Sequence, residues 1–467
     1  MDFLMKIANV IISIGNFLWG VPMLTLLGLL GIILTVGTKG FQFRRFGHIW
    51  KNTLGTGNRK QGESQKGISS FKAACMALCN TLGTGNIAGV ALAIAMGGPG
   101  AMFWIWIAML LGMIIKYGEI TMAAKFHELD PDTGLYRGGI MWYIRKGLDK
   151  KWHWLASVFC FVYVIVVINA PAVQINTICS SVTGYFDVPS MLVGGILVVA
   201  MIIVGYGGLK KVSDFAGNII PVMAGSYFLV CIIVIVMNIG KLPETFGLIF
   251  KYAFSDIKAM AGGFGGATVT LAIRHGLCRG FYSSGAGSGD ATFAHSSADV
   301  KHPVQQGMWG ITEVFIDGIV LTCTGLVVLT TGVWESGVSG APLVAEAIGS
   351  AFHSSAFGNI FVIACILLFA FTSAFMCLYY SEVCLKWVTN NNVIKWIYRF
   401  VICGWAFFCT NELFVQKVSI IWSIGDFGSV CVMICACFAV FLLRKEIFKT
   451  TADYEEYYEM TTEEAEK

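Results

Sequence analysis

Long apolar runs separated by short polar stretches dominate this chain of 467 residues. A membrane-spanning helix needs about 20 predominantly apolar residues. By that measure the pattern predicts eleven transmembrane helices in an all-α polytopic membrane protein. The predicted spans are about residues 18–37, 71–96, 100–124, 153–182, 189–206, 214–239, 261–284, 308–332, 356–381, 393–410 and 418–443.

Composition agrees with this class. The chain is 56% hydrophobic and 13% charged, whereas soluble proteins carry about 25% charged residues. Its 54 glycines far outnumber its 9 prolines, and small residues let helices approach closely in lipid. Most of the 15 cysteines stand singly within apolar runs, where cysteine behaves as a small hydrophobe. We therefore expect neither a disulfide framework nor a metal cluster.

The distribution of basic residues predicts the orientation. With the N-terminus outside, the inner segments carry 25 Lys and Arg residues and the outer segments carry 5. Because cytoplasmic loops hold the excess of positive charge, we expect a multi-pass protein of the cell (inner or plasma) membrane with a cytoplasmic C-terminus. Residues 1–15 lack the basic start and cleavage site of a signal peptide. The acidic tail from Ala452 onward is predicted to be disordered.

The heptad N-T-L-G-T-G-N occurs twice, at residues 52–58 and 80–86. The first copy lies in a basic loop and is predicted to be flexible and without function. The second copy lies in the middle of the predicted span 71–96, where paired glycines among polar residues favour unwinding. An unwound helix offers N–H groups to a carboxylate and carbonyl groups to Na⁺. A small-residue helix-packing face is the alternative interpretation.

A second glycine-rich interruption follows five spans later, where residues 281–287 read F-Y-S-S-G-A-G. Broken helices at corresponding positions of two inverted halves are typical of secondary transporters. The chain then divides into an extra N-terminal helix with a basic loop (1–70), two five-helix halves (71–240 and 241–445) and an acidic tail (446–467).

Several motifs resemble the alanine or glycine:cation symporters, bacterial and archaeal carriers with a LeuT-type five-plus-five inverted repeat. The resemblance extends over most of the chain and includes G-T-G-N-I-A-G-V (83–90), G-G-P-G-A-M-F-W (97–104), Y-R-G-G-I-M-W-Y-I-R-K-G-L (136–148), H-P-V-Q-Q-G (302–307) and F-A-F-T-S (369–373). It implies uptake of a small neutral amino acid of the alanine or glycine class, driven by Na⁺ or less often by H⁺. The family's fold does not require a partner subunit, so a monomer is possible.

The resemblance also implies which residues form the site. The substrate carboxylate is expected at the N–H groups around Thr84, Gly85 and Asn86. The other residues expected around the substrate are Gln174, Phe281, Tyr282, Ser283, Ser284 and Cys377, with Phe281 or Tyr282 as a lid. The co-transported Na⁺ is expected at Cys79, Thr81, Leu82, Asn86, Thr372 and Ser373, where carbonyl and hydroxyl oxygens suit a hard cation.

One segment departs from the family pattern. The family typically has S-N-E-A-G-M-G-S-A-P where this chain has S-S-G-A-G-S-G-D-A-T at 283–292. Ser284 and Gly285 replace Asn and Glu, and an acid appears instead at Asp290. Five residues correspond to about 1.4 helical turns, so Asp290 is predicted to point away from the position of the lost Glu. We therefore expect a less acidic pocket with altered ion or substrate preference.

Other polar residues lie within predicted spans. Lys116 and Glu119 are three residues apart and are expected to form a structural or a gating ion pair. Glu313 and Asp317 share a helix face without a basic partner at that spacing, so a hydrogen-bonding role and a functional acid both stay open. Asp426 lies between glycines and suggests another interruption.

Other classes of protein are less well supported by the sequence. A membrane enzyme would need a metal-ligand cluster, a Ser-His-Asp arrangement or a cofactor motif, and ATP-driven pumping would need a P-loop; none is found. A channel would not need paired broken helices. The same fold with altered substrate or H⁺ coupling, or an amino-acid sensor that does not transport, are the alternatives. The expected partners are a small neutral amino acid and the lipid bilayer, and no nucleic acid.

Overall fold

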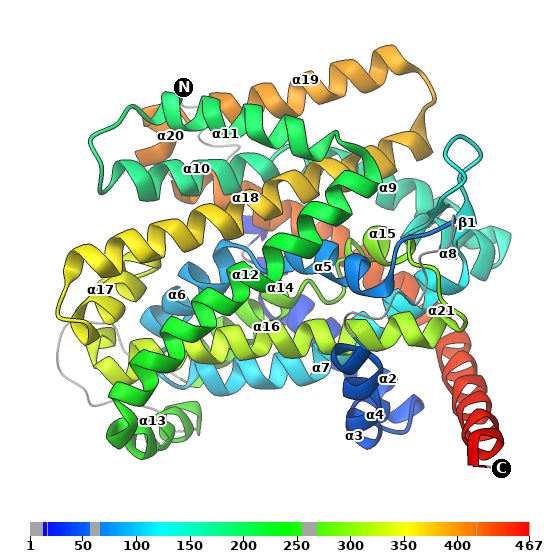
Figure 1. The fold of residues 1–467 in the computed structure, drawn as a ribbon, viewed down its shortest axis with the longest axis horizontal. Coiled ribbons are helices and arrows are strands. Elements are labelled where there is room, and N and C mark those ends of the chain that lie inside the picture. Colours follow the sequence, from blue (N-terminus) through cyan, green and yellow to red (C-terminus); the bar gives the residue numbers. More distant parts are fainter. Residues whose placement is uncertain (1–12, 16, 57–65, 255–268, 417, 467) are drawn as a thin grey trace.

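The computed structural model describes residues 13–15, 17–56, 66–254, 269–416 and 418–466, and most of them are helical (Figure 1). The first part of the chain contains α2 (Val21–Gly37), α3 (Phe41–Arg44), α4 (Phe46–Asn52), η1 (Leu54–Thr56), α5 (Ser70–Thr81), η2 (Thr84–Asn86), α6 (Ala88–Gly97), α7 (Ala101–Lys125), α8 (Ile140–Gly147), η3 (Lys150–Trp152), α9 (Trp154–Val166), α10 (Ala170–Thr183), α11 (Ser190–Gly205) and α12 (Gly208–Met237). Strands β1 (Glu128–Leu129) and β2 (Tyr136–Arg137) pair antiparallel between α7 and α8.

The second part of the chain is also helical. It contains η4 (Ile239–Lys241), α13 (Leu242–Phe254), α14 (Val269–Ser284), α15 (Ala291–His295), α16 (Pro303–Thr331), η5 (Val333–Glu335), α17 (Ala341–Ala351), α18 (Ser355–Val388), α19 (Asn392–Phe408), α20 (Glu412–Gln416) and α21 (Val418–Glu466). Within the described ranges, six helical segments are long and apolar enough to cross a membrane. The molecule is therefore a helical membrane protein, while the number of eleven spans and the five-plus-five division stay predictions.

Most predicted spans coincide with helices to within a few residues, and the start of the span predicted at 261–284 lies outside the described residues. Besides the predicted break in 71–96, one further span is divided. The predicted span 153–182 consists of α9 and α10, with a turn at 167–169 between them. Pro171 lies in the first turn of α10. Because proline has no N–H and disfavours helical geometry in the residue before it, a helix restarts here more readily than it continues. The Asn169 side chain at the turn accepts a hydrogen bond from Trp405 Nε1 at 3.1 Å.

The interrupted helices lie in the interior of the bundle. Figure 1 shows α10, α11 and α19 together along one side and α7 with α16 along the other. Helices α5, α6 and α14 lie between these groups, and α7 packs against both α16 and α14. Each half-helix is thus surrounded by protein, which is the setting in which unwound backbone is tolerated at membrane depth.

Glycines allow α14 to approach α7 closely. A Cβ added at Gly276 would lie 2.4 Å from the Ala101 carbonyl oxygen, and one at Gly280 would lie 2.5 Å from Ala108 Cβ. Residues 276 and 280 are four apart and share one helix face. The contact is therefore of the small-residue type that holds transmembrane helices together.

We expect Gly276→Ala to destabilise the protein, because its methyl group meets backbone that cannot rotate away. Overpacking of this kind costs roughly 1–3 kcal/mol. Gly225→Ala on α12 is the matched control, since nothing lies within 4 Å of its added Cβ. Thermal unfolding of the detergent-purified variants measures the difference. Equal unfolding temperatures for the two variants would contradict the close-packed contact.

The C-terminal segment is folded rather than disordered as predicted. Helix α21 continues to Glu466. The Glu455 carboxylate lies 2.6 Å from Arg44 and 3.3 Å from Arg45, and the Tyr454 hydroxyl lies 2.9 Å from His48 Nε2. Acidic and aromatic side chains of the tail thus pack on the basic α3–α4 segment. This contact requires the first loop and the C-terminus to lie on the same side of the membrane.

Two other predictions made from local pattern are wrong. The first heptad copy is not a free loop as far as Thr56, because Leu54–Thr56 form η1 and the buried Thr53 hydroxyl lies 2.9 Å from the Thr312 hydroxyl. Residues 57–65 lie outside the described part of the chain. Asp426 does not interrupt its helix, since α21 runs through it. A glycine costs only about 1 kcal/mol relative to alanine in a helix interior, and tertiary packing can offset that cost.

Candidate functional site

The two interrupted helices face one cavity of about 160 Å³. The end of α5 and η2 supply one wall, the end of α14 and the loop after it supply a second, and α10, α18 and α21 complete it. The lining residues are Asn80, Thr81, Gly83, Thr84, Gly85, Ala170, Gln174, Phe281, Tyr282, Ser283, Gly285, Ser288, Asp290, Ser373, Cys377, Ser429 and Met433. This volume is below the range of about 300–1,000 Å³ that is usual for drug-sized ligands, so the cavity suits a small solute.

The first interruption lies where the second heptad predicts it. Helix α5 ends at Thr81, Leu82 leaves the helical region with ψ 87°, and α6 begins only at Ala88. The predicted break at Gly83–Gly85 is confirmed. Nothing lies within 4 Å of a Cβ built at Gly85, so its backbone is open toward the cavity that it lines.

The side chain of Asn86 stabilises this break. Its Oδ1 accepts a hydrogen bond from the Gly83 N–H at 3.1 Å, and its Nδ2 donates to Asp317 Oδ1 on α16. The N–H groups of Thr84 and Gly85 donate to no acceptor among the described residues. Two unused donors therefore line the cavity, and such donors can bind a carboxylate.

The second interruption follows the end of α14 at Ser284. Gly285, Gly287 and Gly289 have φ values of +60°, +86° and +75°, and α15 starts at Ala291. Residues with a Cβ rarely adopt this left-handed conformation, whereas glycine does so readily. The predicted second break is therefore confirmed, and its glycines turn the chain sharply beside the cavity.

The aromatic pair before this break differs in environment. Phe281 is fully buried. The Tyr282 ring packs edge-to-face on Trp19 with centroids 5.8 Å apart, and the Arg279 guanidinium lies 5.6 Å from its centre. Tyr282 thus connects the cavity wall to the turn that precedes α2.

Most predicted substrate-binding residues meet at the cavity. Those that line it are Thr84, Gly85, Gln174, Phe281, Tyr282, Ser283 and Cys377. Asn86 and Ser284 are buried outside its lining. The Thr84 hydroxyl donates to Gln174 Oε1 at 3.4 Å, so α10 contacts the unwound segment directly at the cavity wall.

The predicted cation ligands are divided between the cavity and the helix interiors. Thr81 and Ser373 line the cavity, and the Ser373 hydroxyl donates to the Asn80 carbonyl at 3.1 Å. The Thr372 hydroxyl instead donates to the Phe369 carbonyl of its own helix at 2.9 Å. Cys79, Leu82 and Asn86 are fully buried and do not line the cavity. The Asn80 carbonyl and the Ser373 hydroxyl are oxygen ligands of the kind that Na⁺ prefers.

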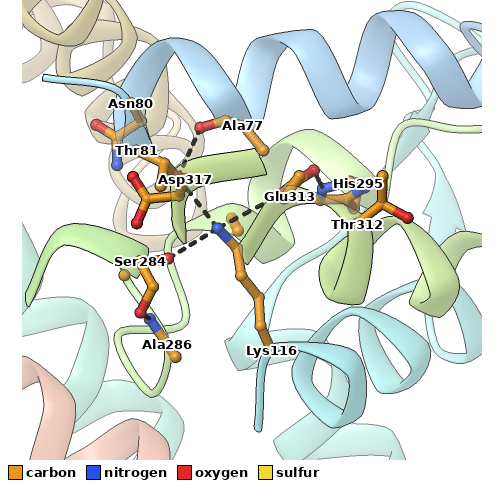
Figure 2. Close-up of polar contacts among 12 residues, drawn as sticks. Ala77, Asn80, Thr81, Lys116, Ser284, Ala286, His295, Thr312, Glu313 and Asp317 are labelled. Atoms are coloured by element: carbon orange, nitrogen blue, oxygen red, sulfur yellow. Dashed lines mark hydrogen bonds and ion pairs between the residues drawn. The ribbon is translucent and has the colours of Figure 1, made fainter. Parts of the chain in front are cut away.

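A buried lysine joins the two interruptions (Figure 2). The Lys116 ammonium donates to the Thr81 hydroxyl at 3.0 Å and to the Ser284 carbonyl at 2.9 Å, and lies 3.1 Å from Glu313 Oε2. Lys116 thus makes two hydrogen bonds and one ion pair, all of them buried. Because helix C-termini carry partial negative charge, one fixed cation at the ends of α5 and α14 stabilises both.

The predicted Lys116–Glu119 pair is wrong. Lys116 pairs with Glu313 on α16, whereas Glu119 Oε2 accepts from the Gly287 N–H at 3.3 Å. Spacing along α7 allows a pair between residues 116 and 119, but the tertiary packing of α7 on α16 brings a better partner. A charged partner on another helix gives no signal in local spacing.

The acids of α16 both take part in buried networks. Glu313 Oε1 lies 2.5 Å from His295 Nε2, and His295 Nδ1 lies 2.6 Å from Gln306 Nε2. Asp317 Oδ1 accepts from Asn86 of the first interruption and from the Ser283 hydroxyl of the second at 3.1 Å. Asp317 therefore connects α16 to both interruptions, and Glu313 connects α16 to Lys116 of α7 and His295 of α15.

The prediction for Asp290 is also wrong. Its carboxylate lines the cavity, and a Cβ built at Gly285 would lie 3.7 Å from Asp290 Oδ1. The left-handed glycines turn the chain back, so that five residues no longer correspond to 1.4 helical turns. The pocket therefore keeps an acid, and the expectation of a less acidic pocket is withdrawn.

Sequence reasoning missed the contributions of Asn80 and Asp290. Asn80 Nδ2 donates to Asp290 Oδ2 at 2.6 Å, which joins the two interruptions across the cavity. Asn80 is a polar residue within an apolar run, and Asp290 is an acid in a glycine-rich segment. Only the return of the loop, however, shows that they meet.

A helical membrane protein with two interrupted helices around one small polar cavity has the architecture of a secondary transporter. The chain matches the sodium:alanine symporter family over residues 4–467. It belongs to this family of transporters, which are not enzymes. The predicted family is thereby confirmed.

Several relatives match over nearly their whole length. The chain is 34% identical to an uncharacterized transporter of Haemophilus influenzae, covering 96% of each chain. It is 32% identical to the sodium/alanine symporter AgcS of Methanococcus maripaludis, covering 90% of this chain and 91% of that protein. It is also 32% identical to the "Probable sodium/glutamine symporter GlnT" of Bacillus subtilis, covering 96% of this chain and 91% of that protein.

Proposed function

We propose that this protein couples the uptake of a small neutral amino acid, alanine or glycine, to the entry of Na⁺ by alternating access. The observation that carries the proposal is the small cavity lined by both interrupted helices. It combines unused N–H donors with carbonyl and hydroxyl oxygens at one place. A zwitterion and a cation need these two kinds of group.

The substrate carboxylate binds the N–H groups of Thr84 and Gly85. Gln174 and Ser283 complete the polar contacts, while Phe281 and Tyr282 bound the apolar end and Tyr282 acts as the lid. The cavity of about 160 Å³ favours alanine or glycine over glutamine, the solute named for one relative. Each additional methylene-sized group that does not fit costs roughly 1–3 kcal/mol of discrimination.

Na⁺ binds where the first interruption meets α18. The Asn80 carbonyl and the Ser373 hydroxyl supply ligands from the two sides. The further ligands expected are the carbonyls of Cys79 and Leu82 and the hydroxyls of Thr81 and Thr372. For Thr372 this requires its hydroxyl to leave the Phe369 carbonyl. Binding there orders the unwound segment, after which the amino acid closes the outer side.

The protein lies in the cell membrane. The proposed orientation places its N-terminus outside the cell and its C-terminus in the cytoplasm. The excess of basic residues on one side supports it. The ion pairs of Glu455 with Arg44 and Arg45 support it as well, because they require those two segments to share a side. One copy of the chain contains every residue of the cavity, so a monomer can carry out the cycle.

The test is uptake of labelled alanine and glycine into proteoliposomes with an inward Na⁺ gradient. We expect saturable uptake that disappears when choline replaces Na⁺ and that a proton gradient alone does not drive. Uptake driven by the proton gradient without Na⁺ would show that H⁺ rather than Na⁺ is the coupling ion. Binding without net uptake would identify a sensor, and preferential uptake of glutamine would refute the assignment of a small substrate.

A further inference from the structure

The carboxylate of Asp290 lacks a fixed counter-charge. Among the described residues that line the cavity, Asp290 is the one with a charged side chain. None of the ion pairs among the described residues includes it. A second acid, Glu119, accepts from the Gly287 N–H of the same loop. The nearby Lys116 donates to the Ser284 carbonyl and pairs with Glu313 rather than with Asp290. An uncompensated carboxylate at membrane depth is costly and is usually functional.

The Ser288 hydroxyl lies between two acceptor oxygens beside Asp290. The Ser288 hydroxyl lies 2.5 Å from the Gly285 carbonyl and also contacts Asp290 Oδ1. A hydroxyl has one proton, so it can donate to only one of these two oxygens. The other contact brings lone pairs together, an arrangement that a bound cation would relieve.

Helix capping accounts for only part of this arrangement. Asp290 precedes α15, and its Oδ1 accepts from the Ala291 N–H at 2.9 Å. Its Oδ2 accepts from Asn80 Nδ2 at 2.6 Å. Neither bond accounts for the Ser288 hydroxyl, which contacts both the Asp290 carboxylate and the Gly285 carbonyl. All three residues are half-buried and line the cavity, so a solute that enters can reach them.

We propose that Asp290 Oδ1, the Ser288 hydroxyl and the Gly285 carbonyl form a monovalent-cation site of the substrate cavity, separate from the Na⁺ site at Asn80 and Ser373. Carboxylate, hydroxyl and carbonyl oxygens suit a hard cation. Two sources share this chemistry, a Na⁺ ion and the ammonium group of the substrate. The inference rests on the proposed function in one respect, namely that the cavity admits an amino acid and Na⁺.

The charge of the cavity determines what it holds. An empty cavity with Asp290 ionised has one negative charge, and a zwitterion alone leaves that charge unchanged. A Na⁺ ion compensates it, and an ammonium group compensates it locally while the substrate carboxylate lies at the N–H groups of Thr84 and Gly85. The acid thereby favours entry of a cationic group together with the substrate.

The experiment compares Asp290→Asn, Ser288→Ala and the control Asp299→Asn, which neutralises a half-buried acid outside the cavity lining. Binding of ²²Na⁺ to the detergent-purified full chain is measured without amino acid, and alanine KM is measured in proteoliposomes. We expect Asp290→Asn to raise the half-saturating Na⁺ concentration about tenfold, which corresponds to about 1.4 kcal/mol. Ser288→Ala should raise it about threefold, which corresponds to less than about 1.4 kcal/mol. Asp299→Asn should leave it unchanged. Size-exclusion profiles in detergent identify any variant that does not fold, and Ser288→Ala then tests the site independently.

The outcomes separate the sources of the cation. Unchanged ²²Na⁺ binding with an alanine KM raised about tenfold in Asp290→Asn would assign the site to the substrate ammonium. If neither quantity changes in a folded Asp290→Asn or Ser288→Ala variant, the proposal is overturned. If the wild-type protein binds ²²Na⁺ through Asp290 but shows no Na⁺-driven uptake, the proposed function fails while the cation site stands.

Discussion

Lys116→Met is expected to be the most destabilising single change in the membrane core. Lys116 and Glu313 are both fully buried. Removing the ammonium leaves Glu313 with His295 alone and leaves the Ser284 carbonyl without its donor. Breaking a buried pair from one side costs about 3–5 kcal/mol. Thermal unfolding in detergent and Na⁺-dependent uptake should therefore both show a large loss.

The matched control lies on the same helix. Lys125→Met removes a lysine at the end of α7 that pairs with Glu446 at 2.7 Å, with side chains 27% and 34% exposed. A partly exposed pair of this kind contributes at most about 1 kcal/mol. The double variant Lys116→Met/Glu313→Gln should regain part of the lost stability, because no buried charge is left unpaired at that place. Lys116→Met as stable as Lys125→Met would show that the buried network contributes little.

Asn86→Ala is expected to weaken Na⁺ and substrate together. Asn86 holds the Gly83 N–H on one side and Asp317 on the other, so its loss loosens the unwound segment that both solutes require. Coupling between two sites of a symporter is typically about 1–3 kcal/mol. We therefore expect the half-saturating Na⁺ concentration and the alanine KM to rise about tenfold or more each.

The control for this change is Asn359→Ala. Asn359 is a half-buried asparagine of α18 whose side chain donates to the Ser355 carbonyl of its own helix. Ser283→Ala, which removes the other donor to Asp317, should have a smaller effect than Asn86→Ala. An Asn86→Ala variant in which only one of the two affinities changes would mean that the solutes do not share the segment.

Buried contacts connect the two interruptions to each other. Lys116 contacts Thr81 of the first interruption and Ser284 of the second. Asp317 likewise contacts Asn86 of the first and Ser283 of the second. A change at one break therefore alters the hydrogen bonds of the other. Coupling of this kind requires an element with two arrangements that both ligands influence, and we expect the unwound segments to be that element.

The sequence by itself determined the helical membrane class, the approximate ends of most spans and the positions of both interruptions. Each depends on local composition: apolar length sets a span, and glycines beside polar residues weaken a helix where they stand. For this reason one helix ends within the N-T-L-G-T-G-N at 80–86, and another ends at the glycines after Ser284.

Only the tertiary structure decided which polar groups meet. Lys116 pairs with Glu313, far along the chain, although spacing along α7 favoured Glu119. Asp290 returns to the cavity because three left-handed glycines reverse the chain, and residues 452–458 fold because Arg44 and Arg45 lie nearby. Side-chain pairing across helices depends on how the helices pack, and one sequence does not contain that information in its local pattern.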